Sequence, residues 1–305
     1  MVESRVCFPS DLKLLSQSAD KCLSLIARWF KEVPLQLNYW GTLLHRSSFQ
    51  LSRVYRNKGK NYKKRLKESL KGHLKFCTHL YEKLFETLPL IKKNLKDSLK
   101  HVYDELLTFM DYFKKHRDLV ERRILKGEKI PHEEKLFSIF ETHTEWISKG
   151  KSNKKVELGH AVCITTNQDH FCLHWQVMEK ESDVDMPDKI ASFMKDNFEQ
   201  TPINSWSFDR NFGSKENREN LQKKVECLVM PRKGKLSKKQ KEKENQKEFK
   251  KHRRKHATVE ANINQLECLG AGKCPDKGIQ AFKRYVGLSV IAYNIHRIGR
   301  LSKNL

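Results

Sequence analysis

The chain of 305 residues is poor in the features that mark membrane, secreted and zinc-binding proteins. It contains no run of eighteen apolar residues, so the sequence predicts no transmembrane helix. Its first residues, MVESRVCFPSDL, lack the charged and then apolar pattern of a signal peptide. None of the eight cysteines forms a C-x-x-C pair, which gives no support to a zinc knuckle or a redox pair. We therefore expect a cytoplasmic protein with reduced thiols.

Acidic residues are scarce beside basic ones, with 37 Asp and Glu against 61 Lys and Arg and a formal net charge of +24. This excess is larger than solubility requires and indicates a polyanionic partner, namely DNA, RNA or an acidic membrane surface. Residues 53–75 hold ten Lys/Arg and one Glu, and residues 231–256 hold 13 Lys/Arg and three Glu. The first segment is either a solvated helix face or a face that contacts DNA, and the second is either a disordered insertion or a clamp for nucleic acid. The residues that we single out for such contacts are Lys63, Lys64, Arg65, Lys238, Lys239, Arg253 and Arg254.

The first part of the chain has helical spacing of its apolar residues. Ser10 or Asp11 is placed to cap a helix that ends before Pro34, and a second helix is predicted over 43–55. Leucines then step by three and four up to Leu88, and Pro89 is expected to break this helix and open the next one. An antiparallel helical hairpin explains this spacing better than a coiled coil. We expect residues 1–130 to be mainly helical.

The second part, residues 131–305, alternates strand and helix patterns, which predicts an α/β fold with a mixed sheet and covering helices. The basic segment 231–250 is predicted to be a flexible loop that becomes helical near Phe249. The apolar pattern between Phe282 and Ile298 predicts a buried helix. The predicted strands are 137–140, 157–166, 171–178, 206–209 and 226–230, and the predicted helices lie near 188–198 and 214–224, the second of them capped by Ser214.

Two carboxylates stand out in this second part. On a helix, Glu260 shares one stripe with Arg253, His256 and Glu267, at the exit of the basic segment. Asp209 closes a short apolar strand pattern. Either acid has an ordinary explanation, because Glu260 can be a solvated residue of an amphipathic helix and Asp209 a turn or cap residue. The alternative is that both hold a metal ion.

The residue patterns around these acids resemble those of a known family. The phrase H-x-x-V-E-x-N-I-x-x-L-E at 256–267, followed by CPDKG at 274–278 and FKRYVGL at 282–288, resembles the C-terminal signature of DDE insertion-sequence transposases. SFDRNF at 207–212 resembles the strand-end motif of the same family. The phrases FETHTEWISKGK at 140–151 and VELGH at 156–160 also resemble it, although we assign no role to their histidines, His143 and His160.

The resemblance implies an RNase H-like catalytic domain that transposes DNA by cleaving and joining strands at insertion-sequence ends. It also implies that Asp209 and Glu260 are catalytic and bind Mg²⁺ or Mn²⁺. Lys283 and Arg284, within the C-terminal signature, are further candidates for DNA contacts. The partners would be the terminal repeats of the element and the target DNA, in the cytoplasm and associated with the nucleoid. Whether the protein forms a homo-oligomer is left open.

The chain departs from the family pattern at its start. The family carries its first carboxylate in a motif of the form D-T-T-V-V-E, and Val2 and Glu3 match only the end of that motif. The aspartate would fall upstream of Met1, so we expect an N-terminally truncated transposase with impaired activity. One alternative is a non-catalytic DNA-binding remnant of a transposase. Another is a basic helical RNA-binding scaffold, which explains the charge but not the two motifs.

Overall fold

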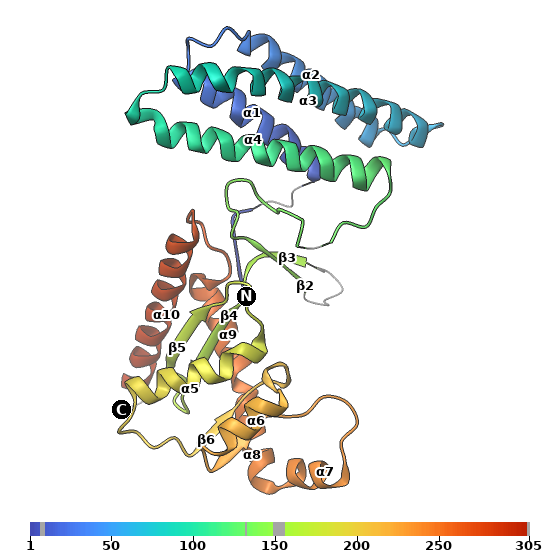
Figure 1. Ribbon diagram of the computed structural model, residues 1–305. Coiled ribbons are helices and arrows are strands. Elements are labelled where there is room, and N and C mark those ends of the chain that lie inside the picture. Colours follow the sequence, from blue (N-terminus) through green and yellow to red (C-terminus); the bar gives the residue numbers. More distant parts are fainter. Residues whose placement is uncertain (7–9, 132, 149–155, 304–305) are drawn as a thin grey trace. The chain divides into compact units, whose positions relative to one another are not determined.

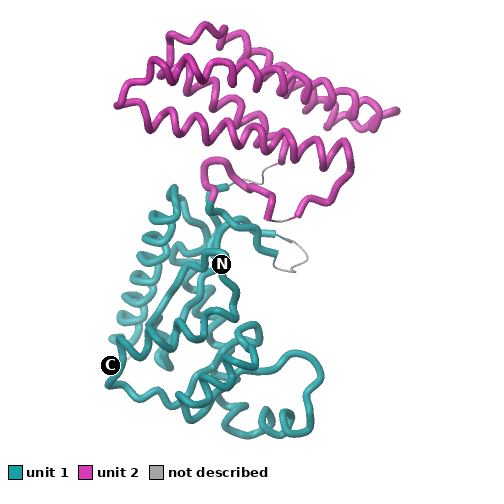
Figure 2. Tube along the Cα trace, in the orientation of Figure 1, with its two compact units in different colours: residues 1–7, 143–305 teal, residues 8–142 magenta. Residues whose placement is uncertain are grey.

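The computed structural model describes residues 1–6, 10–131, 133–148 and 156–303, and the end of the FETHTEWISKGK phrase lies outside them. The chain separates into two compact units (Figure 2). Phe8–Thr142 form the helical unit, and Met1–Cys7 join His143–Leu305 in the mixed unit. The division therefore falls at Thr142 rather than at residue 130. Among the described residues, no helix has the length and apolar character needed to cross a membrane.

Four long helices make up most of the helical unit: α1 (Asp11–Trp29), α2 (Leu37–Arg56), α3 (Tyr62–Lys93) and α4 (Lys100–Val120). Helix α1 packs along α4, and α2 along α3 (Figure 1). The apolar residues at helical spacing meet in one core, where Leu15, Ile26 and Phe113 are fully buried. Ser10 caps α1 as expected, because its Oγ accepts a hydrogen bond from the Lys13 N–H at 3.2 Å. The short turns η1 (Asp97–Leu99) and η2 (Glu121–Leu125) flank α4.

Two expectations for this unit are wrong. Pro89 lies inside α3, which continues to Lys93, because Leu88 and Ile91 bury their side chains on either side of the proline. The strand expected at 137–140 is an irregular turn. There the Ser138 Oγ accepts hydrogen bonds from the N–H groups of Phe140 and Glu141. Ile139, only 3% exposed, packs in the helical core instead of pairing in a sheet.

The mixed unit contains strands in three small sheets with helices packed around them, which confirms the α/β class (Figure 1). The prediction of one mixed sheet is wrong for the described residues, because the antiparallel and parallel pairs lie in separate sheets. β1 and β2 both pair antiparallel with β3, β4 and β5 form a hairpin, and β6 and β7 are parallel. The strands are β1 (Val2–Glu3), β2 (Glu145–Ser148), β3 (Val156–His160), β4 (Val162–Thr166), β5 (Cys172–Val177), β6 (Ser205–Ser207) and β7 (Cys227–Val229). The helices are α5 (Met186–Asn197), α6 (Lys215–Gln222), α7 (Lys238–Asn245), α8 (Lys247–His256), α9 (Thr258–Leu266) and α10 (Ile279–Ser302), with short turns η3 (Asp183–Asp185), η4 (Arg210–Phe212) and η5 (Glu267–Ala271).

Helix α6 is the crossover between the parallel strands β6 and β7. Two parallel strands need such a connection because the chain must return to the end of the sheet where the first strand began before the second strand can start. Ser214 begins the helix by accepting the Asn217 N–H at 2.9 Å, as the sequence predicts. Leu221 and Leu228 are buried in one cluster with Met186 of α5. This packing fixes where each of the two strands ends.

The basic segment after β7 is more ordered than expected. Residues 238–245 form helix α7 instead of a flexible loop, and α8 follows directly. Ser237 and Gln240 form a capping box: the Ser237 Oγ accepts the Gln240 N–H, and the Gln240 side chain accepts the Ser237 N–H at 3.0 Å. Phe249, in α8, is 5% exposed and anchors this helix to the rest of the unit. Local capping and one buried ring thus order a segment of very polar composition.

The prediction of a buried helix holds for one side of α10 and is wrong for the other. Phe282, Val286 and Tyr293 lie in the core beneath β5. Because the helix is apolar on most sides and only one side is covered, the opposite side exposes an apolar stripe to solvent. More than half of each of these side chains is exposed: Leu288, Ile291, Ile295 and Ile298.

The pairing of β1 with β3 predicts a sharp requirement for glycine at position 159. A Cβ there would contact the Val2 carbonyl oxygen and lie 2.9 Å from the Glu3 Cα, so the strand would have to move. We expect Gly159→Ala to lower the free energy of unfolding by about 1–3 kcal/mol in urea titrations. Gly72→Ala, on α3 where nothing lies within 4 Å of the added Cβ, is the control and should be neutral or stabilising. Equal stability of the Gly159 variant and the natural chain would contradict the packing of β1.

Candidate active site

Asp209 lies just beyond the end of β6. The Phe208 N–H donates to the Val229 carbonyl at 2.9 Å, which extends the pairing with β7 by one residue. The chain then leaves the sheet and forms the short turn η4. The exposed Asp209 carboxylate caps this turn by accepting the Arg210 N–H at 2.7 Å. The capping role weighed for Asp209 is therefore confirmed, while the role of a metal ligand stays a prediction.

Glu260 lies in the first turn of α9, four residues after His256 at the end of α8. The two helices are joined through Ala257, whose backbone is itself helical (φ −60°, ψ −23°). Residues four apart therefore still share one face across the junction, as the periodicity predicts. Helix α8 packs against both β6 and β7. This packing brings the face with His256 to the strand end that carries Asp209.

A small cavity of about 160 Å³ lies at this junction. Ser207 and Asp209 line it from the β6 side, Val229 from β7, and Arg253 and His256 from α8. Its size admits several water molecules or a small hydrated ion. The cavity thus combines a carboxylate, an imidazole and a guanidinium from segments that are far apart in the sequence.

The electrostatics of His256 connect both candidate acids to this place. Burial lowers the pKa of His256, and three influences oppose it: the charges of Asp209 and Glu260 and a hydrogen bond to the Ser207 backbone. Both carboxylates therefore act on the same imidazole. The structure brings Asp209 and Glu260 into one neighbourhood, around a histidine that the sequence pattern had placed only beside Glu260.

The residues around this cavity do not amount to a metal site by themselves. Within the described part of the chain, no three His, Cys, Asp or Glu side chains are arranged to hold a metal ion. Asp209 and Glu260 are both exposed, and the Asp209 carboxylate already accepts one backbone N–H. A two-metal centre needs several oxygen ligands in fixed positions. The prediction that both acids bind Mg²⁺ or Mn²⁺ therefore lacks a complete ligand set.

The candidates for DNA contacts fall into three groups. Lys63, Lys64 and Arg65 are exposed at the start of α3 in the helical unit, where Arg65 donates to the Asn57 carbonyl at 3.0 Å. The basic residues of α7 and α8 are also exposed: Lys238, Lys239, Arg253 and Arg254. The two on α10 face protein carboxylates, since Lys283 pairs with Glu179 and Arg284 lies 3.7 Å from Asp276. This pairing makes the α10 residues the weakest candidates.

His143 and His160, to which the sequence assigned no role, form a packed pair. The His143 Nδ1 lies 2.8 Å from the His160 Nε2, and the His160 Nδ1 lies 3.1 Å from the Met178 carbonyl oxygen. The His160 side chain is almost fully buried, and its burial lowers the pKa of its imidazole. The nearby Glu145 carboxylate acts in the opposite direction. These contacts account for the two rings as structural groups.

Sequence reasoning missed a second, larger cavity beside α6 and α7. Its presence depends on α7, and the signal for that helix was available in the sequence. The phrase S-K-K-Q at 237–240 has the Ser and Gln spacing of a capping box, which marks the beginning of a helix. The low apolar content of the segment hid this signal.

Comparisons of the chain with family models, with curated proteins and with solved structures yield no match.

The neighbourhood of His256 predicts how its pKa responds to substitution. Asp209→Asn removes a negative charge that favours the imidazolium, so we expect the pKa of His256 to fall further below its ordinary value. Glu260→Gln should act in the same direction. Titration of the His256 ring protons by NMR measures both shifts. Asp188→Asn, an exposed change on α5, should leave this pKa in place, and an unchanged pKa in the Asp209 variant would contradict the shared neighbourhood.

Proposed function

We propose that this chain is a DDE-transposase-like protein that binds DNA and takes part in DNA transposition through an RNase H-like core. The observation that carries the proposal is the position of the two acids around His256, because the sequence resemblance names these same two acids: Asp209 lines the small cavity together with His256, and Glu260 follows His256 by one helical turn. They come from a strand end and a helix that are 51 positions apart in numbering. Had the two acids lain on opposite sides of the unit, the proposal that they form one site would have had no basis.

The order of elements also supports the proposed core. Antiparallel strands β2 to β5 come first, and α5 leads to the parallel pair β6 and β7 with α6 as the crossover. Helices α8 and α9 then return to the strand ends. The antiparallel and parallel pairs lie in separate small sheets, so the support comes from the order of elements and from the positions of the two acids, one after a strand and one on a later helix.

We propose that DNA strand cleavage by this chain is impaired. A divalent cation supplies charge neutralisation at the phosphate during strand cleavage. Asp209 and Glu260 offer two carboxylates for such an ion, and the described residues add no third ligand. Since a catalytic unit loses most of its effect when one member is missing, we expect weak cleavage or none from this chain alone.

A second candidate is a non-catalytic DNA-binding protein that shares the transposase fold. The specific observation in its favour is that the described residues place no group of three His, Cys, Asp or Glu side chains where it could hold a metal ion. Both candidates require DNA binding, for which the net charge of +24 and the exposed Lys and Arg of α3, α7 and α8 are suited. Contacts of this kind neutralise phosphates without reading the sequence, so affinity should fall steeply with salt.

The start of α3 provides a direct test of DNA binding. We expect Lys63→Glu with Lys64→Glu to weaken binding of duplex DNA about tenfold or more at low salt and to reduce the salt dependence, because two phosphate contacts are lost. Lys92→Glu with Lys93→Glu, at the exposed other end of the same helix, makes the same change in net charge and should weaken binding less. Fluorescence anisotropy with a labelled duplex measures both. Equal losses in the two variants would indicate that α3 contributes only through net charge.

A nicking assay distinguishes the two candidate functions. Purified chain is incubated with terminal-repeat DNA and Mg²⁺ or Mn²⁺, and we expect at most slow nicking that Asp209→Ala or Glu260→Ala abolishes. Asp188→Asn serves as the folded control. No detectable nicking with intact DNA binding favours the non-catalytic candidate. Nicking that survives both alanine substitutions would exclude Asp209 and Glu260 as its source.

A further inference from the structure

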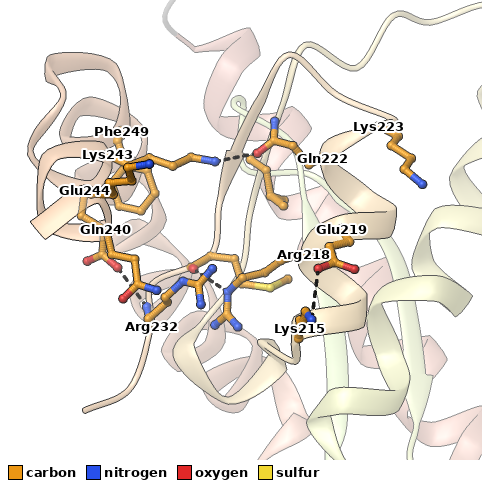
Figure 3. Close-up of a pocket in the computed structure, with 13 residues that line it drawn as sticks. Lys215, Arg218, Glu219, Gln222, Lys223, Arg232, Gln240, Lys243, Glu244 and Phe249 are labelled. Carbon is orange, nitrogen blue, oxygen red and sulfur yellow. Dashed lines mark hydrogen bonds and ion pairs between the residues drawn. The ribbon is translucent and has the colours of Figure 1, made fainter. Parts of the chain in front are cut away.

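The larger cavity, of about 530 Å³, lies between α6, β7 and the α7–α8 segment (Figure 3). Leu228, Met230 and Phe249 provide its apolar lining, and each is less than a tenth exposed. Its volume falls within the ~300–1,000 Å³ typical of pockets for small organic ligands. A buried apolar surface of this kind suits a flat, weakly polar group.

Basic side chains surround this apolar lining. Six Lys or Arg residues and two Glu residues contribute to the cavity, so positive charge dominates. The basic residues are Lys215, Arg218, Lys223, Arg232, Lys239 and Lys243. An anion carried by a flat organic body would match this combination better than either a free ion or a neutral apolar ligand.

The two carboxylates of the lining do not neutralise this charge. Glu244 accepts the Arg232 backbone N–H at 3.0 Å and faces Arg253 outside the cavity at 3.9 Å. Glu219 lies 4.0 Å from Lys215, and both of these side chains are mostly exposed, so the pair is weak. Within the described residues, the side chains of Arg232 and Lys239 make no ion pair.

Two further basic residues are held by neutral partners. The Arg218 guanidinium donates to the carbonyls of Ser214, Met230 and Pro231 at 3.0–3.4 Å, which fixes its position. Lys243 extends from α7 to the Gln222 Oε1 of α6 at 2.8 Å, across the space shown in Figure 3. The neutral Gln222 oxygen accepts a hydrogen bond from the Lys243 ammonium group but does not neutralise its charge, which stays available to a ligand.

This cavity and the small one next to Asp209 lie on opposite sides of one extended segment. Successive side chains of a strand point to opposite faces. Leu228 and Met230 face the larger cavity, whereas Val229 and Pro231 face the smaller one. Arg253 lines the smaller cavity and lies against Glu244, which lines the larger. DNA held near Asp209 would therefore have the larger cavity within reach.

We propose that the larger cavity binds one unpaired nucleotide of a DNA strand. Its phosphate lies among the basic side chains of Arg232, Lys239 and Lys243, and its base packs on the apolar surface of Leu228, Met230 and Phe249. A base pair within a duplex presents no free base, so only an unpaired or extruded nucleotide enters. The proposal rests on the proposed function in one respect, namely that DNA is the polymer bound.

The test compares two labelled duplexes in EDTA by fluorescence anisotropy. One carries a single bulged adenosine and the other an abasic residue at the same place, so their phosphate charge is identical. We expect the full chain to bind the adenosine duplex at least about fivefold more tightly, as stacking of one base on an apolar or aromatic surface provides. In the double variant Lys239→Glu, Lys243→Glu the ratio of the two affinities should fall to about one, because the phosphate is no longer held and the base does not enter the cavity.

Lys241→Glu with Lys247→Glu is the matched control, since both residues are exposed on α7 and α8 outside the cavity and the net charge changes equally. It should lower both affinities and keep their ratio. Tight binding of both duplexes with a ratio of one would overturn the nucleotide site and leave DNA binding intact. Loss of the ratio in both double variants would also overturn it. No binding of either duplex would overturn both proposals, and because EDTA is present the outcome does not depend on cleavage.

Discussion

The parallel pairing of β6 with β7, held against α8, is the interaction on which both cavities depend. It places Asp209 at a strand end, and the buried Phe249 keeps α8 close enough for His256 and Arg253 to line the same space. The next residues of the same extended segment form one wall of the larger cavity. Loss of this pairing would separate Asp209 from the His256 imidazole, while Glu260 would stay beside that ring on the same helical face, and it would open both cavities together.

Positive charge constrains the mixed unit in a second way. Helices α7 and α8 are so rich in Lys and Arg that they have few apolar contacts with the rest of the unit, and Phe249 is the buried one. Their helicity therefore relies on local devices, of which the Ser237–Gln240 capping box is the clearest. The mutual repulsion of these side chains opposes their close packing, so the capping box and Phe249 must offset it.

Local sequence signals were enough to predict the elements that are determined by residues close together in the chain. The caps at Ser10 and Ser214 and the helical spacing of α1 to α4 follow from side chains within a few residues, and the structure confirms them. Ile139 and the exposed side of α10 were misjudged because their surroundings depend on residues far away in the chain. For the same reason the sequence pointed to Asp209 and Glu260 separately, whereas their common neighbour His256 became evident only through the packing of α8 on the sheet.

The incomplete ligand set and the intact nucleotide-sized cavity have different consequences for function. A metal centre fails sharply when one ligand is missing, because the remaining oxygens cannot fix the ion against its hydration shell. Affinity for DNA falls gradually as phosphate contacts are lost, because each of many contacts contributes a small part of it. If the chain binds DNA as proposed, its exposed basic residues would therefore support that affinity whether or not the two acids hold a metal ion. The nucleotide site proposed for the positively charged cavity beside β7 would likewise need no metal ion.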